Sequence, residues 1–168
     1  MREGLIYNQT KIPRDKWRYG FRSSAAVGCG WIATFNALKL MGYYAAPKAL
    51  IRYFERQFPL LHGNAGTSFW GPALYFRKWG FPVKMVFQRR RFDESARKAD
   101  VSILFFHWRR GLRFGAHFVA VTHDSNGFTG YNTYRNSEGP DRYGQSLDAF
   151  LRSRKYFGAV LICIKDKR

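Results

Sequence analysis

The stretch Gly28–Gly42 reads GCGWIATFNALKLMG and places one of the chain's two cysteines between two glycines, directly before a helical pattern. Trp31, Phe35 and Leu38 recur at helical spacing, so a helix is expected through this stretch. A sulfur at a helix N-terminus meets unpaired backbone N–H groups that stabilise a thiolate, and flanking glycines allow a tight turn that leaves it uncovered. Cys29 is therefore a nucleophile of lowered pKa or a small buried residue.

Two further helices are expected after this stretch. One runs from about Pro47 to Phe58, with an apolar stripe on one face. The other ends at Trp79 and begins near Thr67 and Ser68, either of which could cap it. The first 27 residues are expected to be irregular because no hydrophobic period is sustained there.

Strand patterns dominate after Pro82. The expected strands are VKMVF, VSILFFHW, AHFVAVTH, GFTGYNT and FGAVLICI, and the expected short helices are DESARK and SLDAFLRS, the second capped by Ser146. Helices followed by strands predict an α+β fold. We expect a single domain over residues 1–168, with helices in about 29–80 packed on a mostly antiparallel sheet in about 82–165.

The chain is strongly basic. Its 29 lysines and arginines outnumber 11 acidic residues, giving a formal net charge of +18. Such a field favours anionic partners, so a preference for acidic peptides, proteins or anionic polymers as substrates is expected; a surface charge that only keeps the protein soluble is the alternative. Nucleic acid is the less favoured partner, because no nucleic-acid-binding motif accompanies the charge. The sequence does not indicate an oligomeric state.

Targeting signals and disulfides are not indicated. No apolar run reaches the length of a membrane span, and the first residues have no apolar signal-peptide core. We therefore expect a cytoplasmic protein, or a secreted one whose leader has been removed. Two cysteines do not make a disulfide framework, and no histidine or cysteine pair has zinc-site spacing, so neither a metal nor an organic cofactor is expected.

A hairpin supplies partners for Cys29. Turn residues separate AHFVAVTH from GFTGYNT, and pairing His123 with Phe128 across that turn places His117 and Asn132 as diagonal neighbours on one face. The imidazole of His117 could then accept a thiol proton, while the amide oxygen of Asn132 held its other nitrogen. A satisfied core histidine is the alternative for His117.

An acyl-transfer site also needs donors for the developing oxyanion. The backbone N–H of Cys29 is one candidate, and a side-chain amide upstream is the other. Gln9 is the only glutamine before Cys29, although a surface loop residue is an equal interpretation of it.

The order of YNQ, GCG, GAHFVAV and GYNT resembles the papain-like cysteine peptidases, and within them the bacterial branch of bacteriocin-leader-processing peptidases and stand-alone relatives. The resemblance implies Cys29 as nucleophile, His117 as base and acid, Asn132 as orienting residue, and Gln9 with Cys29 as the oxyanion hole. Two positions depart from that branch: Asn132-Thr133 stands where Asp-Pro is usual, and Ala116 separates the glycine from the histidine.

Together these features predict a thiol hydrolase, a cysteine peptidase that cleaves an amide bond in a peptide through Cys29, His117 and Asn132. Two alternatives stay open. The same site could transfer the acyl group to an amine, as an acyltransferase or cross-linking enzyme. The fold could also be a catalytically inert basic module that binds nucleic acid or an anionic surface.

Overall fold

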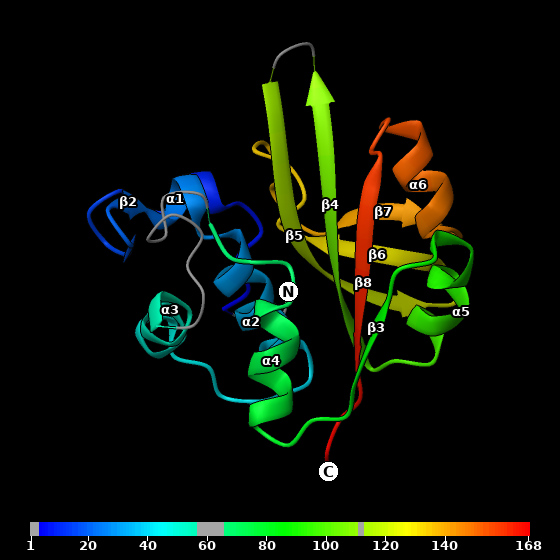
Figure 1. The fold of residues 1–168 in the computed structure, drawn as a ribbon, viewed down its shortest axis with the longest axis horizontal. Coiled ribbons are helices and arrows are strands. Elements are labelled where there is room, and N and C mark those ends of the chain that lie inside the picture. The colour runs from blue at the N-terminus through cyan, green and yellow to red at the C-terminus, as the bar shows by residue number, and fades with distance from the viewer. Residues whose placement is uncertain (1–3, 57–65, 111–112) are drawn as a thin grey trace.

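A computed structural model describes residues 4–56, 66–110 and 113–168, and Figure 1 shows their arrangement. In chain order the elements are η1 (Gln9–Lys11), β1 (Arg18–Tyr19), β2 (Arg22–Ser23), α1 (Ser24–Val27), α2 (Cys29–Leu40), α3 (Pro47–Arg56), α4 (Gly71–Lys78), β3 (Val83–Val86), η2 (Arg89–Arg91), α5 (Phe92–Arg97), β4 (Val101–Arg110), β5 (Arg113–Asp124), β6 (Gly127–Tyr131), β7 (Asp141–Gly144), α6 (Leu147–Ser153) and β8 (Gly158–Ile164). The expected helix end at Phe58 lies outside the described residues.

The described strands after α4 form one six-stranded sheet, in the order β3-β8-β4-β5-β6-β7, and every pairing in it is antiparallel. The expected hairpin is confirmed, since His123 pairs with Phe128 across its turn. The ladder between β5 and β6 ends at Ala120 and Tyr131, one residue before Asn132. The paired ends of β4 and β5 extend beyond the neighbouring strands (Figure 1).

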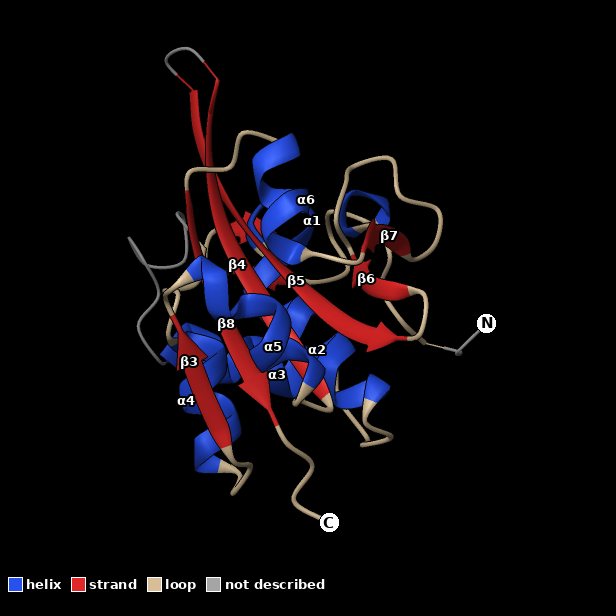
Figure 2. Ribbon diagram, turned by 90° about the vertical axis from the view of Figure 1, so that its right-hand side faces the viewer, coloured by secondary structure: helices blue, strands red, loops and turns tan. Residues whose placement is uncertain are grey.

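All described strand pairings in this sheet are antiparallel, so the α+β class is confirmed. Helices cover both faces of the sheet, with α5 and α6 as an additional layer. Figures 1 and 2 place α2, α3 and α4 on one side and α5 and α6 on the other. Each side has its own apolar cluster. Phe118 and Ala120 of β5 belong to the first, while Val119 and Val121 belong to the second, because alternate side chains point to opposite faces.

Helix α2 is the centre of the first cluster. Its residues from Gly30 to Leu38 are all buried, including Trp31 and Ile32 at 0 % exposure. A helix that is apolar nearly all round fits only inside a protein. Because α2 packs against β5 and β4, its first residue is held close to the strand that carries His117. Among the residues that the structure describes, no helix combines the length and apolarity that crossing a bilayer requires.

Two local expectations are wrong, and one strand is missing from the prediction. Helix α4 begins at Gly71, and Thr67 does not cap it, because the Thr67 hydroxyl hydrogen-bonds the buried hydroxyl of Tyr19 at 2.9 Å. The first 27 residues are not irregular throughout, since they form η1, the β1–β2 pair and α1. Strand β7 also has no expected counterpart, because its four residues show little apolar alternation. The cap at Ser146 is confirmed, with its hydroxyl accepting the Ala149 N–H at 3.2 Å.

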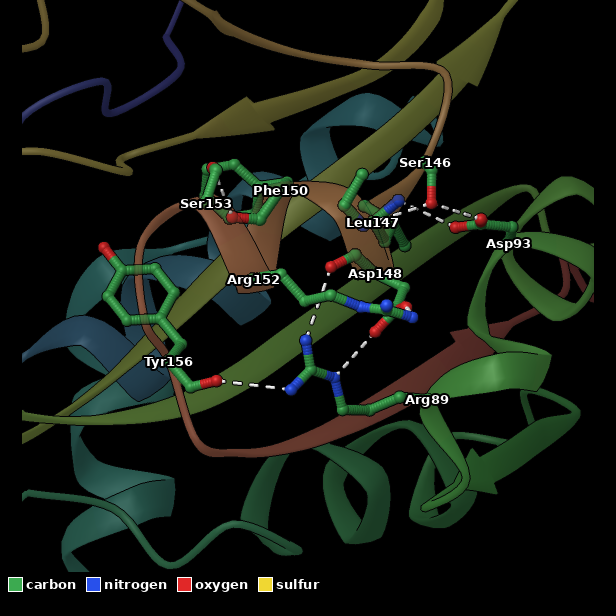
Figure 3. Close-up of polar contacts among 10 residues, drawn as sticks. Arg89, Asp93, Ser146, Leu147, Asp148, Phe150, Arg152, Ser153 and Tyr156 are labelled. Carbon is green, nitrogen blue, oxygen red and sulfur yellow. Dashed lines mark hydrogen bonds and ion pairs between the residues drawn. The ribbon is translucent and has the colours of Figure 1, made fainter.

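Polar contacts join η2 and α5 to α6 within the second helical layer (Figure 3). Arg89 forms an ion pair with Asp148 at the start of α6, with 2.9 Å between Nε and Oδ1, and donates to the carbonyl oxygen of Tyr156 at 3.3 Å. Asp93 of α5 accepts the hydroxyl hydrogen bond of Ser146 at 2.7 Å. These bonds fix the loop of Tyr156 between α6 and β8.

Candidate active site

Helix α2 begins at Cys29, directly after α1, with Gly28 as its N-cap residue. The flanking glycines allow close packing. A Cβ on Gly30 would lie 2.4 Å from Oγ1 of Thr67, and a Cβ on Gly28 would lie 2.6 Å from the carbonyl oxygen of Ser24. Gly28 has an ordinary φ of −82°, so its role is to allow this approach and not to provide a left-handed turn.

The four predicted site residues line one cavity of about 190 Å³. They come from four separate parts of the chain, with Gln9 in η1, Cys29 at the start of α2, His117 in β5 and Asn132 after β6. Four aromatic residues also line it: Phe106, Trp108, Tyr134 and Tyr156. Cys29 keeps part of its surface exposed and is therefore accessible from the cavity.

The segment of Gln9 is tied down at both ends. Buried Asn36 of α2 accepts the Ile6 N–H at 2.9 Å and donates to the Ile6 carbonyl at 2.8 Å. Asn132 likewise makes two hydrogen bonds to Gln9. Oδ1 of Asn132 accepts the backbone N–H of Gln9 at 2.8 Å, and Nδ2 of Asn132 donates to Oε1 of the Gln9 side chain at 3.1 Å. The Nε2 of Gln9 donates to the Ala25 carbonyl at 3.2 Å. The Gln9 amide therefore has a fixed orientation at the cavity.

The imidazole of His117 meets the backbone carbonyl oxygen of Asn132, with 2.6 Å between this oxygen and Nε2. A carbonyl oxygen only accepts hydrogen bonds, so the neutral ring must carry its proton on Nε2. Nδ1 then has a free lone pair and is the atom that can accept a proton.

This arrangement corrects the expectation for Asn132. The oxygen that orients His117 belongs to the main chain, whereas the side-chain amide holds Gln9. The physical reason is the backbone: Asn132 has a φ of 70°, so the chain leaves the β6 ladder at this residue. Asn tolerates this left-handed conformation better than most residues. Extending the strand pairing to Asn132 was therefore wrong, although the residue does reach the site.

The protonation states also differ from expectation. Burial raises the pKa of the Cys29 thiol to about 11, although the backbone N–H groups of Phe118, Gly30 and Cys29 itself act in the opposite direction. Burial lowers the pKa of His117, its bond to Asn132 opposes this, and the charge of Arg135 lowers it further. At neutral pH the site therefore holds a neutral thiol and a neutral imidazole. Desolvation outweighs the helix N-terminus that led us to expect a lowered thiol pKa.

Several residues of the site have no motif in the sequence. Asn36 gives no signal because it lies inside an apolar helix, and Arg135 follows the expected strand by a few residues. His123 is exposed at the hairpin end, and His107 stacks on Phe157, so neither lines this cavity. Within the described part of the chain, no three histidine, cysteine or acidic side chains converge in a way that could hold a metal ion.

No protein family and no curated protein matches the sequence. The fold is similar to the peptidase domain of Streptococcus ComA, a bifunctional ABC transporter involved in quorum sensing, with a TM-score of 0.52 and 16% identity over 82% of this chain and 91% of that domain. It is also similar to a double-glycine-motif protease from an AMS/PCAT transporter in complex with its leader peptide, with a TM-score of 0.52 and 15% identity over 93% and 96% of the two chains.

These similarities define the class of fold. The chain has a papain-like fold, as these two peptidase domains do, and the order of its motifs predicted this fold. At such low identity the likeness concerns the fold, so the chemistry has to be argued from the residues of this chain.

Proposed function

We propose that this protein is a thiol hydrolase that cleaves an amide bond in a peptide. The observation that carries the proposal is the single cavity shared by Gln9, Cys29, His117 and Asn132. A nucleophile, a base of defined tautomer and an oriented amide are the groups that acyl transfer to sulfur requires.

The first half of the reaction uses the neutral pair. Nδ1 of His117 accepts the thiol proton as the sulfur of Cys29 bonds to the substrate carbonyl carbon. The oxyanion of the tetrahedral intermediate accepts hydrogen bonds from the Cys29 backbone N–H and from Nε2 of Gln9. The carbon–nitrogen bond then breaks, and the imidazolium gives its proton to the leaving amine.

The second half releases the acyl group. Nδ1 of His117 accepts a proton from water while the water oxygen attacks the thioester carbon. The carbon–sulfur bond breaks, Cys29 recovers its proton from His117, and a carboxylic acid leaves. The bond from Nε2 to the Asn132 carbonyl keeps the ring in the tautomer that both halves require.

Cavity size supports small residues next to the cleaved bond. The space beside Cys29 is about 190 Å³, and its wall includes the indole of Trp108 and the phenol of Tyr156. Glycine fits such a space with the least displacement. The AMS/PCAT protease with a similar fold acts on a double-glycine motif, so peptides with two glycines before the cleaved bond are the first substrates to test.

The test is cleavage of fluorogenic peptides that contain Gly-Gly, Ala-Ala or Val-Val at the centre. We expect cleavage after Gly-Gly by the full chain, and none by Cys29→Ala. Mass spectrometry of the products distinguishes a free carboxylic acid from an acyl group transferred to an added amine. Activity that persists in Cys29→Ala would exclude the proposed chemistry, and an inactive wild-type protein would favour the inert binding module.

A further inference from the structure

A second cavity adjoins the candidate active site. Its volume is about 490 Å³, and it shares Thr10, Ala25, Ala26 and Arg135 with the cavity of Cys29 and His117. A molecule bound at Cys29 can therefore continue into this second space. We call it the arginine pocket.

The arginine pocket takes its charge from three separate segments. Arg14 follows η1, Arg22 lies in β2, and Arg135 lies in the loop between β6 and β7. All three arginines are exposed. Among the described residues that line this pocket there is no carboxylate, and the remaining lining residues are small or hydroxylated.

The arginine pocket gathers three positive charges around an open space, and no carboxylate is among its described lining residues. Like charges held together repel one another. Binding of an anion therefore lowers the electrostatic free energy of the three arginines.

Arg135 is also coupled to the reaction centre. Its backbone carbonyl accepts hydrogen bonds from Nδ2 of Asn8 at 2.6 Å and from Oγ1 of Thr10 at 3.2 Å, which fixes its loop beside Gln9. Its charge reaches His117 and lowers the pKa of that ring. An anion that neutralises Arg135 would therefore increase the basicity of the group that must accept the thiol proton.

We propose that the arginine pocket is a subsite for acidic side chains of a peptide substrate, next to the bond cleaved at Cys29. The proposal rests on the thiol hydrolase function above and specifies its substrate class. Guanidinium groups bind carboxylates through paired, charge-assisted hydrogen bonds, which gives both affinity and orientation. Because the pocket shares four lining residues with the cavity of the nucleophile, a peptide that reaches both is favoured over a nucleic acid.

The test measures binding separately from chemistry. Isotope-labelled Cys29→Ala protein is titrated by NMR with the peptide acetyl-Glu-Glu-Gly-Gly-Glu-Glu-amide and with its glutamine counterpart. We expect the glutamate peptide to bind about tenfold more tightly at low salt, with shifts at the residues that line both cavities. Changing Arg14, Arg22 and Arg135 together to glutamine should make the two affinities equal.

A charge-matched control separates the subsite from the overall field. Lys48, Arg52 and Arg56 are exposed on α3 and line neither cavity, so their joint change to glutamine removes the same charge and should preserve the preference. Loss of the preference in this control, or equal binding of the two peptides by Cys29→Ala, overturns the proposal. So does a short single-stranded DNA that binds the same arginines more tightly than the glutamate peptide.

The proposed hydrolase function can fail independently. If the wild-type protein cleaves neither peptide while Cys29→Ala still prefers the glutamate peptide through the three arginines, the subsite stands and the hydrolase is wrong. If the wild-type protein cleaves both peptides equally and the binding preference is absent, the hydrolase stands and the subsite is wrong.

Discussion

The two cysteines occupy different environments, although burial raises the thiol pKa of both. Cys163 lies in β8, between Lys84 of β3 and Ser102 of β4, and is only 7% exposed. Cys29 begins α2 and lines a cavity together with His117. A low thiol pKa therefore does not distinguish the candidate nucleophile from the structural cysteine. Both cysteines line a cavity, and the difference is the base: His117 lines the cavity of Cys29, whereas no histidine is among the described residues that line the cavity of about 320 Å³ at Cys163.

The largest expected effect is on kcat/KM, when each cysteine in turn is replaced with alanine. Cys29→Ala should lower kcat/KM for a Gly-Gly peptide by about 10⁴-fold, because the group that bonds to the substrate is lost. Cys163→Ala should leave kcat/KM nearly unchanged and lower the free energy of unfolding by about 1 kcal/mol, since it removes only a buried packing group. Steady-state kinetics and urea unfolding measure the two quantities. Similar kinetic losses in both variants would contradict the distinction between the cysteines.

The next effect concerns the side-chain amide of Gln9, which is proposed to stabilise the oxyanion. Gln9→Ala should lower kcat by about 10²-fold with little change in KM, because its amide acts on the oxyanion. Asn132→Gly keeps the backbone conformation and the carbonyl that orients His117, but removes the amide that holds Gln9. It should cause a similar loss, and adding it to Gln9→Ala should cost little more.

A different result would show another role for Asn132. If its side chain oriented His117 directly, Asn132→Gly would shift the pH dependence of kcat/KM, and its loss would multiply with that of Gln9→Ala. Measuring the single and double variants from pH 5 to pH 10 separates the two roles.

Alkylation sharpens the comparison of the thiols themselves. Iodoacetamide should modify Cys29 about 10²-fold faster than Cys163 near neutral pH, because Cys29 is accessible and His117 can accept its proton. Since burial raises the pKa of Cys29 to about 11, the rate should still be rising above pH 9. Peptide mapping by mass spectrometry follows both sites. A rate that is already constant at neutral pH would mean a preformed thiolate, and equally slow modification of both cysteines would exclude a reactive Cys29.

The smallest effect concerns stability in acid. Burial holds the pKa of His117 below its usual value near 6.5, so the unfolded chain binds a proton there before the folded protein does. His117 therefore lowers the free energy of unfolding as the pH falls below about 6.5. His117→Gln should reduce the difference between the urea midpoints at pH 7 and pH 5. An unchanged difference in His117→Gln would mean that the ring is solvated.

Residue patterns predicted most of the fold. The apolar period of α2, the turn between β5 and β6 and the cap at Ser146 depend on neighbours in the sequence, so they could be recognised there. The motifs also predicted that Gln9, Cys29, His117 and Asn132 would meet.

The remaining features depend on three-dimensional packing. Thr67 looked like a helix cap, but its hydroxyl meets Tyr19, which is remote in the sequence. Because Asn132 has a positive φ, its backbone carbonyl, and not its side chain, meets His117. The alternation of residues along a strand does not predict such a change in backbone conformation. The pKa of Cys29 is set by how closely other atoms surround the sulfur, and spacing in the sequence does not report this.

The bonds between Gln9 and Asn132 join residues 123 positions apart. A ribosome releases Cys29 early in synthesis and Asn132 much later, so the thiol leaves the exit tunnel long before the groups that orient its partners. Until then neither the Gln9 amide nor the His117 tautomer is fixed. The growing chain therefore carries an ordinary cysteine, and the candidate site is complete only after β6 and Asn132 have been made.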